Sequence, residues 1–120
     1  MARENEHILE DDATHPIRSV RIIDTVTKLN GGGEYLGIVI ASPLQGDKRS
    51  ITRLNAKLKM YVDEFETERF LNVKRLADKN RMMIYVSIHP SSAPEAFRLL
   101  EEARPLIEKK GIKFVVDTDV

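Results

Sequence analysis

The stretch that decides the fold is RMMIYVSIHPSSAPEAFRLLEEARPLIEKKGIKFVVDTDV, residues 81–120. Apolar residues occupy every second position of residues 82–88, which is the period of a β-strand. Within residues 96–107 they instead repeat every three or four positions, which predicts an amphipathic helix. A second alternating run follows at residues 112–116. The stretch therefore predicts a strand, a helix and a strand, and a one-helix crossover makes the two strands parallel.

Both ends of this helix carry sequence signals. Ser92 and Glu95 have the spacing of a capping box, in which the serine hydroxyl accepts a hydrogen bond from the glutamate amide. Pro94 suits the first turn, and Pro105 predicts a bend in the last third of the helix. Gly111 follows the final turn, where a residue in the left-handed conformation ends a helix. We therefore expect the helix to begin directly after Ser92 and to end before Gly111.

Two further strands are predicted in the first third of the chain. Val20, Ile22 and Val26 share one parity, and residues 35–41 are almost continuously apolar. The four residues 30–33 between them read Asn-Gly-Gly-Gly, which favours a hairpin turn because glycine tolerates positive φ. Phosphate-binding loops are also rich in glycine, but they lead into a helix, whereas a strand follows here. We therefore expect two antiparallel strands.

The strongest helical period in the chain begins after residues 42–46, with Asp47 or Ser50 as the capping residue. Its apolar stripe comprises Ile51, Leu54, Leu58, Tyr61, Val62 and Phe65. Its cations come first and its anions last: Lys48, Arg49, Arg53, Lys57 and Lys59, then Asp63, Glu64, Glu66 and Glu68. The simplest interpretation is a solvated face with weak ion pairs. The alternative is an antiparallel pair of these helices from two copies, each basic half meeting an acidic half.

These elements predict an α/β (α+β) two-layer sandwich of ββαβαβ order, with a mixed four-stranded sheet and two main helices. Residues 67–80 predict a second short helix or an ordered loop. A chain of 120 residues is expected to form one domain. Residues 1–16 are polar and predict a flexible N-terminal tail, so the single α/β domain covers residues 17–120. If the tail is ordered, Ile8 and Leu9 are the expected contacts.

Composition disfavours several classes of partner. The 19 basic and 19 acidic side chains cancel, which argues against general binding to nucleic acid or anionic membranes. Binding of nucleic acid by residues 48–59 is left as a third possibility. The chain has no cysteine, and therefore no disulfide or thiolate site. Without an apolar signal peptide or a run of ~20 apolar residues, a cytoplasmic protein without a membrane partner is expected.

Polar residues gather where the three parallel strands are expected to end. They are His15, Arg18, Gln45, Asp47, His89, Ser91, Ser92, Asp117 and Asp119. Such edges are where α/β sheets bind ligands, and a helix N-terminus beside His89 suits an anion. The hypothesis is a small-molecule site formed by His89, Ser91, Ser92, His15, Asp47 and Asp117. The alternative is that the His-Pro-Ser-Ser turn at residues 89–92 is an ordinary linker.

The sequence offers little support for catalysis or a bound metal. Its three histidines have no helical spacing typical of metal ligands, and no nucleophile elbow surrounds Ser91. We therefore expect no catalytic residue, no metal and no cofactor. An enzyme is the minority interpretation, in the form of a weak hydrolase near His89.

The second face of the sheet predicts self-association. Six residues have the parity opposite to the core set of their strands: Ile23, Tyr35, Val39, Met83, Tyr85 and Val115. If both helices cover the other face, these residues form an apolar patch larger than a monomer normally exposes. A two-fold homodimer would bury it. If the helices lie on opposite faces, no patch exists.

Several segments resemble a group of small bacterial proteins known only as a domain of unknown function. The similar segments are residues 36–40, 54–62, 84–90, 96–98, 103–104 and 111–114, within the range 19–116. The resemblance implies a bacterial origin and a shared fold, and it carries no activity. In that group the second strand tends to run into an Asp-His pair, where this chain has Ala41, Ser42 and Pro43.

Taken together, these observations predict a non-enzymatic binding or interaction module that acts as a homodimer, with another protein as the alternative partner. The second candidate is a small-molecule, anion-binding domain with its site near His89.

Overall fold

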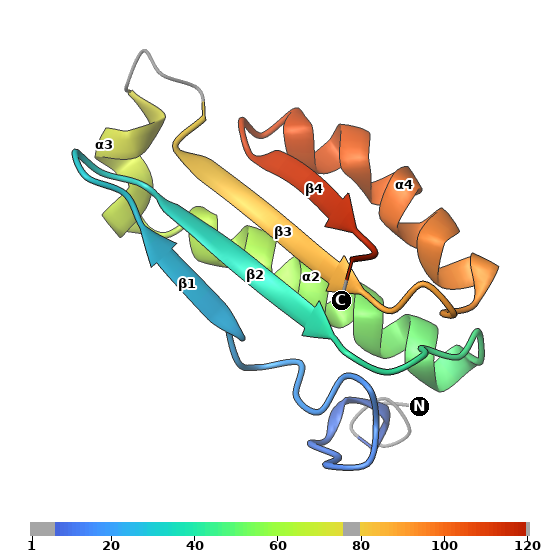
Figure 1. Cartoon of the computed structure of the whole chain (residues 1–120). Helices are drawn as coiled ribbons and strands as arrows, with labels where there is room; N and C mark the ends of the chain where they lie inside the picture. The colour runs from blue at the N-terminus through green and yellow to red at the C-terminus, as the bar shows by residue number, and fades with distance from the viewer. Residues whose placement is uncertain (1–6, 76–79, 120) are drawn as a thin grey trace.

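The chain forms a four-stranded sheet with helices packed on one face, in a computed structural model that describes residues 7–75 and 80–119 (Figure 1). Its elements are β1 (Thr25–Lys28), β2 (Glu34–Ile40), α2 (Lys48–Phe65), η1 (Glu68–Phe70), α3 (Leu71–Lys74), β3 (Met82–Ile88), α4 (Pro94–Glu108) and β4 (Lys113–Asp117). The strands lie in the order β1-β2-β3-β4, with β1 antiparallel to β2 and the other pairs parallel. The predicted α+β fold with a mixed four-stranded sheet is confirmed.

The core lies between the sheet and the two long helices. Helices α2 and α4 cover the same face of the sheet and contact each other (Figure 1). On β3 every second residue from Met82 to Ile88 is buried, and Phe114 on the neighbouring β4 is 2% exposed. Leu54 and Phe65 of α2 are fully buried in the same cluster. The period-two pattern therefore identified the core faces of β3 and β4 correctly.

The turn between β1 and β2 is built from three glycines. Gly31, Gly32 and Gly33 have φ angles of 86°, 108° and 105°, a region that residues with a side chain rarely adopt. The amide of Leu29 donates to the carbonyl of Gly33 at 3.0 Å and closes the turn. The predicted hairpin is confirmed, and its glycines are needed for their backbone conformation.

Strand β1 is shorter than the sequence predicted. The Asp24 carboxylate accepts a hydrogen bond from the amide of Val39 at 2.9 Å, in the place of a further backbone partner for β2. The chain before Asp24 is therefore not part of the sheet. Ile22 is 56% exposed, and Ile23 packs against the core. Ile23 consequently does not lie on the outer sheet face, where the alternation had placed it.

Helix α4 begins without the predicted capping box. Its N-cap residue is Ala93, Pro94 follows, and no side chain caps the helix. The Ser92 hydroxyl instead accepts a hydrogen bond from the amide of Leu44 at 3.0 Å. Ser92 thus connects the start of α4 to the loop after β2, because that buried loop amide needs an acceptor. Asp47 occupies the N-cap position of α2, also without a side-chain cap.

The segment after α2 is helical where the structure describes it. Phe70 and Val73, on η1 and α3, are 2% and 8% exposed. The rings of Phe65 and Phe70 meet edge to face with 4.8 Å between their centroids. Leu71 is 48% exposed, and Leu76 lies outside the described residues. Aromatic contact with the end of α2 therefore holds this segment on the core.

Replacing Gly33 by alanine should destabilise the protein more than replacing Gly111. An added Cβ at Gly33 would lie 2.2 Å from the carbonyl oxygen of Arg81, whereas Gly111, with φ 81°, has nothing within 4 Å. Each variant is expected to lose ~1–2 kcal/mol from positive φ. Gly33→Ala should lose a further ~1–3 kcal/mol from backbone overlap. Denaturant unfolding measures both losses; equal losses would contradict the tight approach at Gly33.

Candidate functional site

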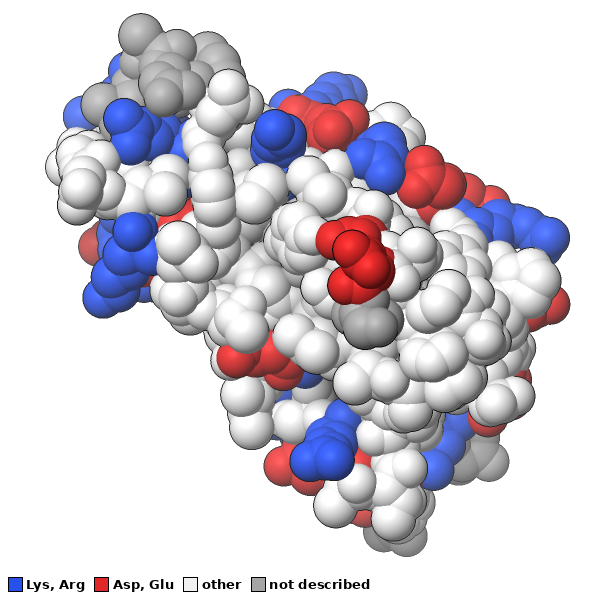
Figure 2. All heavy atoms as spheres, in the orientation of Figure 1, with Lys and Arg blue, Asp and Glu red and all other residues white. Residues whose placement is uncertain are grey.

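Among residues 7–75 and 80–119, no helix covers the sheet face opposite α2 and α4, which is hereafter the open face. Figure 2 views this face and shows uncharged side chains across most of its centre, with acidic side chains where β4 ends. Five of the residues predicted for an interface lie on it: Tyr35, Val39, Met83, Tyr85 and Val115. Val39 is 43% exposed, and the other four are half-buried. Their placement follows from strand parity, and their role in an interface stays a prediction.

A hollow lies at the centre of this open face. Gly37 pairs with Thr25 on one side and with Tyr85 on the other, and all three residues line a depression of about 370 Å³. The Thr25 Oγ1 lies only 2.0 Å from the position that a Cβ of residue 37 would occupy. Glycine at this position therefore leaves room for the Thr25 hydroxyl.

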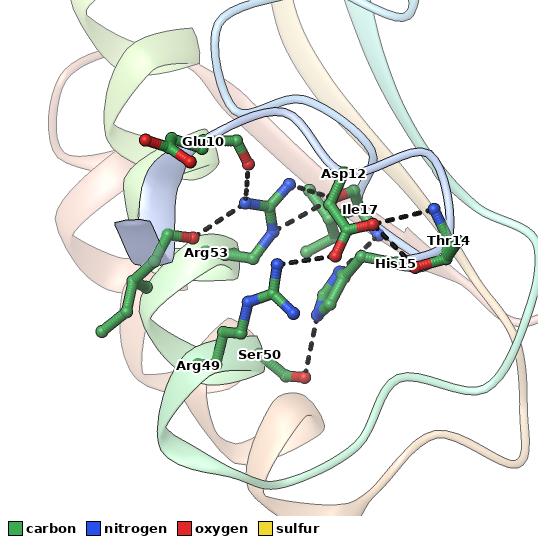
Figure 3. Close-up of polar contacts among 9 residues, drawn as sticks. Glu10, Asp12, Thr14, His15, Ile17, Arg49, Ser50 and Arg53 are labelled. Carbon is green, nitrogen blue, oxygen red and sulfur yellow. Dashed lines mark hydrogen bonds and ion pairs between the residues drawn. The ribbon is translucent and has the colours of Figure 1, made fainter. Parts of the chain in front are cut away.

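A second candidate region lies at the edge of the sheet, where residues 7–19, hereafter the arm, cover α2. The Arg53 side chain of α2 is fully buried beneath the arm. Its Nη1 donates to the carbonyls of Ile8 at 2.8 Å and Glu10 at 2.6 Å, and its Nε donates to the carbonyl of Ile17 at 3.1 Å (Figure 3). One guanidinium therefore binds three points of the arm.

Through these contacts residues 8–17 are held on α2, whereas the sequence predicted a flexible tail over residues 1–16. Leu9 packs against the core, as expected for the alternative of an ordered arm. Residues 1–6 lie outside the described part of the chain. The prediction weighed only the apolar anchors of the arm. Hydrogen bonds from a buried guanidinium to backbone carbonyls add to them, and they leave no trace in the sequence of the arm itself.

The arm is also held by an ion pair at its surface. Arg49 of α2 donates to the Asp12 carboxylate at 2.6 Å (Figure 3). The amide and hydroxyl of Thr14 donate to the same carboxylate at 2.9 and 2.7 Å. These hydrogen bonds from Thr14, followed by that from Arg49, lower the pKa of Asp12. Asp12 therefore stays ionised and shapes the turn of the arm.

One helical turn further along α2, a buried network joins the end of the arm to β2. The Lys57 ammonium, with 3% of its side chain exposed, donates to the carbonyl of Ser19 at 2.6 Å and to the Asp24 carboxylate at 2.8 Å. The Tyr61 hydroxyl accepts from the amide of Asp24 and donates to the carbonyl of Gly37. Burial raises the pKa of Tyr61, so its hydroxyl keeps the proton that it donates.

The arm and the end of β2 enclose a cavity of about 380 Å³, hereafter the edge cavity. Its polar lining includes His15, Arg18, Asp24, Ser42 and Lys57, and its apolar lining includes Ala13, Pro16, Ile22, Val39 and Ala41. It lies at the carboxyl end of the parallel strand β2, at the sheet edge where the sequence predicted a ligand site. This cavity is the candidate small-molecule site.

His15 connects the arm to α2 through both ring nitrogens. Its Nδ1 accepts from the amide of Ile17 at 2.9 Å, so the proton of the neutral ring is on Nε2, which lies 3.0 Å from the Ser50 hydroxyl (Figure 3). Burial, and then the charges of Arg53 and Arg49, lower the pKa of His15. The ring is therefore held neutral and acts as a structural support.

The structure does not bring the other predicted site residues to this cavity. Asp47 lies at the start of α2, and His89, Ser91 and Ser92 form the turn before α4. Their hydrogen bonds are local: the amide of Ser91 donates to Nδ1 of His89 at 3.0 Å. The Asp117 carboxylate accepts from the hydroxyl of Tyr85. The six predicted ligand-binding residues therefore do not form one site, and only His15 among them lines the edge cavity.

Sequence analysis missed the buried polar residues of α2. It treated Arg53 and Lys57 as part of a solvated basic half, yet they are 0% and 2% exposed. A signal was present, because Arg53 and Lys57 lie eight and four residues before Tyr61 of the apolar stripe and therefore share its side of the helix. The two cations are buried because backbone carbonyls and Asp24 satisfy them. A helical stripe shows which residues share a face, but not whether another segment covers it.

The described residues lack the features of a metal site and of a membrane span. No three His, Cys, Asp or Glu residues within residues 7–75 and 80–119 lie together in a way that could hold a metal ion. Among the helices of the same residues, none combines the length and apolar character of a membrane span.

Comparisons with known proteins do not assign the chain to a family. No family model, no curated protein and no solved structure matches it. The resemblance to a bacterial domain of unknown function therefore stays a prediction.

Replacing Arg53 by methionine should release the arm. The variant loses the hydrogen bonds to the carbonyls of Ile8, Glu10 and Ile17, so we expect the free energy of unfolding to fall by about 2–3 kcal/mol. Hydrogen exchange of the arm amides should accelerate, while that of β3 amides changes little. The control is Arg98→Met, which changes an exposed arginine of α4. Unchanged protection of the arm in Arg53→Met would contradict the anchoring role.

Acidification should destabilise the protein through His15. Its folded-state pKa lies below the ordinary value of 6.5, so the unfolded chain binds more protons in that interval. Stability should therefore fall as the pH drops from about 7.5 through 6.5 towards the folded-state pKa. His15→Asn should lose most of this dependence.

The measurement is the midpoint of urea unfolding at several pH values. The matched control is His7→Asn, since the His7 side chain is 79% exposed. The effect of His15 would be refuted if both variants and the unmodified protein showed the same slope between pH 7.5 and 5.5.

Proposed function

We propose that this protein is a non-enzymatic interaction module that works as a homodimer, with the open sheet face as its interface. In this proposal the chain is a two-layer sandwich of ββαβαβ order, and a second copy supplies the layer that the open face lacks. The observation that carries the proposal is that, in the part of the chain that the structure describes, both long helices, α2 and α4, lie on the same face of the sheet (Figure 1). An uncovered face lined by aromatic and aliphatic side chains is typical of an interaction surface.

The residues of the open face suit a protein interface. Tyr35 lies opposite Met83, and Tyr85 lies opposite Val115, so these side chains form neighbouring pairs across three strands. Tyrosine and methionine are enriched at protein interfaces, where their large side chains supply apolar contact area. The hydroxyls of Tyr35 and Tyr85 already have partners, the carbonyl of Asn80 and the Asp117 carboxylate. The rings can therefore be buried without leaving an unpaired hydroxyl.

The hollow at Gly37 favours a second copy as the partner. A two-fold interface is self-complementary: a residue that projects from one copy meets the same surface on the other. On this face Val39 projects and is 43% exposed, and it borders the hollow at Gly37. A projection and a depression on one surface are the elements from which two identical faces interlock.

The alternative at His89 has less support from the geometry. The Ser92 hydroxyl is buried and accepts a hydrogen bond from the amide of Leu44, which gives it a structural role between this turn and the loop after β2. The Nδ1 of His89 accepts from the amide of Ser91 within the same turn. This turn connects β3 to α4, which is the linker role that the sequence left open.

Replacing Val39 by arginine should dissociate the dimer. Each interface would receive two like charges near its centre, which is expected to weaken association at least roughly a hundredfold. The exposure of Val39 allows the variant to keep its fold. Multi-angle light scattering should give twice the mass of one chain for the unmodified protein at micromolar concentration, and the monomer mass for Val39→Arg.

The matched control is Leu106→Arg, because Leu106 is apolar, 67% exposed and located on α4, on the helical side of the molecule. It should remain a dimer. A monomeric unmodified protein would reject the proposal, and dissociation by Leu106→Arg alone would move the interface to the helices.

A further inference from the structure

We propose that the edge cavity binds a small organic monoanion, namely a carboxylate with an apolar body. The cavity has a volume of about 380 Å³, within the range of about 300–1,000 Å³ that is usual for ligand pockets. It lies at the carboxyl end of β2, and the arm forms its opposite wall. The inference does not depend on the proposed homodimer.

The charged side chains that line the cavity favour a ligand with a single negative charge. Lys57 and Arg18 supply two cations, and Asp24 supplies one anion. An ammonium group has three donors, and Lys57 uses two of them, on Ser19 and Asp24. One donor therefore remains at a side chain that is 97% buried, with 3% exposed. A carboxylate oxygen is a strong acceptor for it, because the interaction is charge-assisted and shielded from water.

Arg18 supplies the second contact for an anion. It lines the cavity and is exposed, and its side chain makes no hydrogen bond or ion pair with the described residues. The arm holds its backbone in place, because the Arg18 carbonyl accepts from the amide of Asp12 at 2.8 Å. A guanidinium with free donors at the rim of a cavity can bind both oxygens of a carboxylate.

The apolar lining selects a ligand with a hydrophobic body. Ala13, Pro16, Val39 and Ala41 form walls, and Ile22 lies at the rim with 56% of its surface exposed. A ligand that covers Ile22 removes apolar surface from water, which favours binding by about 25 cal/mol for each Å². Asp24 disfavours a doubly charged ligand, since its carboxylate repels the second charge. The combined chemistry is that of an aromatic or branched aliphatic carboxylate.

The probe for this inference is benzoate, with benzamide as its neutral analogue and acetate as its small analogue. Benzoate should raise the unfolding temperature in a saturable manner, because it binds the folded state. It should also shift the amide resonances of the arm and of residues 39–42. Benzamide lacks the charge and acetate lacks the apolar body, so both should bind more weakly. All titrations are made at the same ionic strength.

The test variant is Arg18→Gln, which removes the rim cation from an exposed position and leaves the buried Lys57 network intact. Benzoate affinity should fall roughly tenfold, the loss expected for one charge-assisted hydrogen bond. Arg98→Gln, on α4 and absent from the cavity lining, is the control and should bind benzoate like the unmodified protein.

Three results would overturn the inference: equal binding of benzamide and benzoate, unchanged affinity in Arg18→Gln, or no shift of the resonances around the cavity. Val39 lines both the edge cavity and the hollow at Gly37, so the oligomeric state is measured in parallel. Benzoate binding by a monomer would uphold the cavity and reject the homodimer. A dimer that fails to bind benzoate would uphold the homodimer and reject the ligand site in the edge cavity.

Discussion

A buried guanidinium holds the N-terminal part of this protein in place. Arg53 lies under the arm without access to water and binds three backbone carbonyls, from residues 36 to 45 positions away in sequence. Burying such a cation is costly unless its donors are satisfied, so the arm and the helix need each other. The edge cavity and the neutral state of His15 depend on this attachment, because residues 13–19 of the arm line the cavity and His15 is itself part of the arm.

The sheet and its core were predictable from the sequence, and the arm was not. Alternation on β3 and the three-to-four period on α2 and α4 each report how one element buries its own side chains, and Ile84, Phe114 and Leu54 are buried as those periods require. The same reasoning failed where a side chain satisfies a distant backbone group. Ser92 was assigned to its own helix but binds Leu44, and Lys57 was assigned to water but binds Ser19. Such contacts depend on tertiary geometry, for which a local pattern contains no information.

The candidate site, too, was predictable from the sequence only in part. The edge cavity lies at the carboxyl end of β2, the kind of edge at which the sequence predicted a ligand site, and His15 lines it. Its role in binding stays a prediction. The remaining lining comes from the arm, from Ile22 and Asp24, from the end of β2 and the residues after it, and from Lys57 of α2. The Asp24 carboxylate accepts from the amide of Val39 directly before β1 begins. Asp24 is the polar residue between Ile22 and Val26 in the alternating run that predicted a strand. In the structure this carboxylate joins Lys57 to β2, so the residue that broke the pattern is also the one that connects the arm, the helix and the sheet.

The close approach of Thr25 to Gly37 makes the two positions mutually dependent. A side chain at residue 37 requires the threonine oxygen to move, so a larger residue there is tolerated only if residue 25 becomes smaller or adopts another rotamer. Among homologous chains that keep this hairpin, the two positions should therefore change together, and the residue at position 25 would show whether the depression in the sheet has been kept or filled.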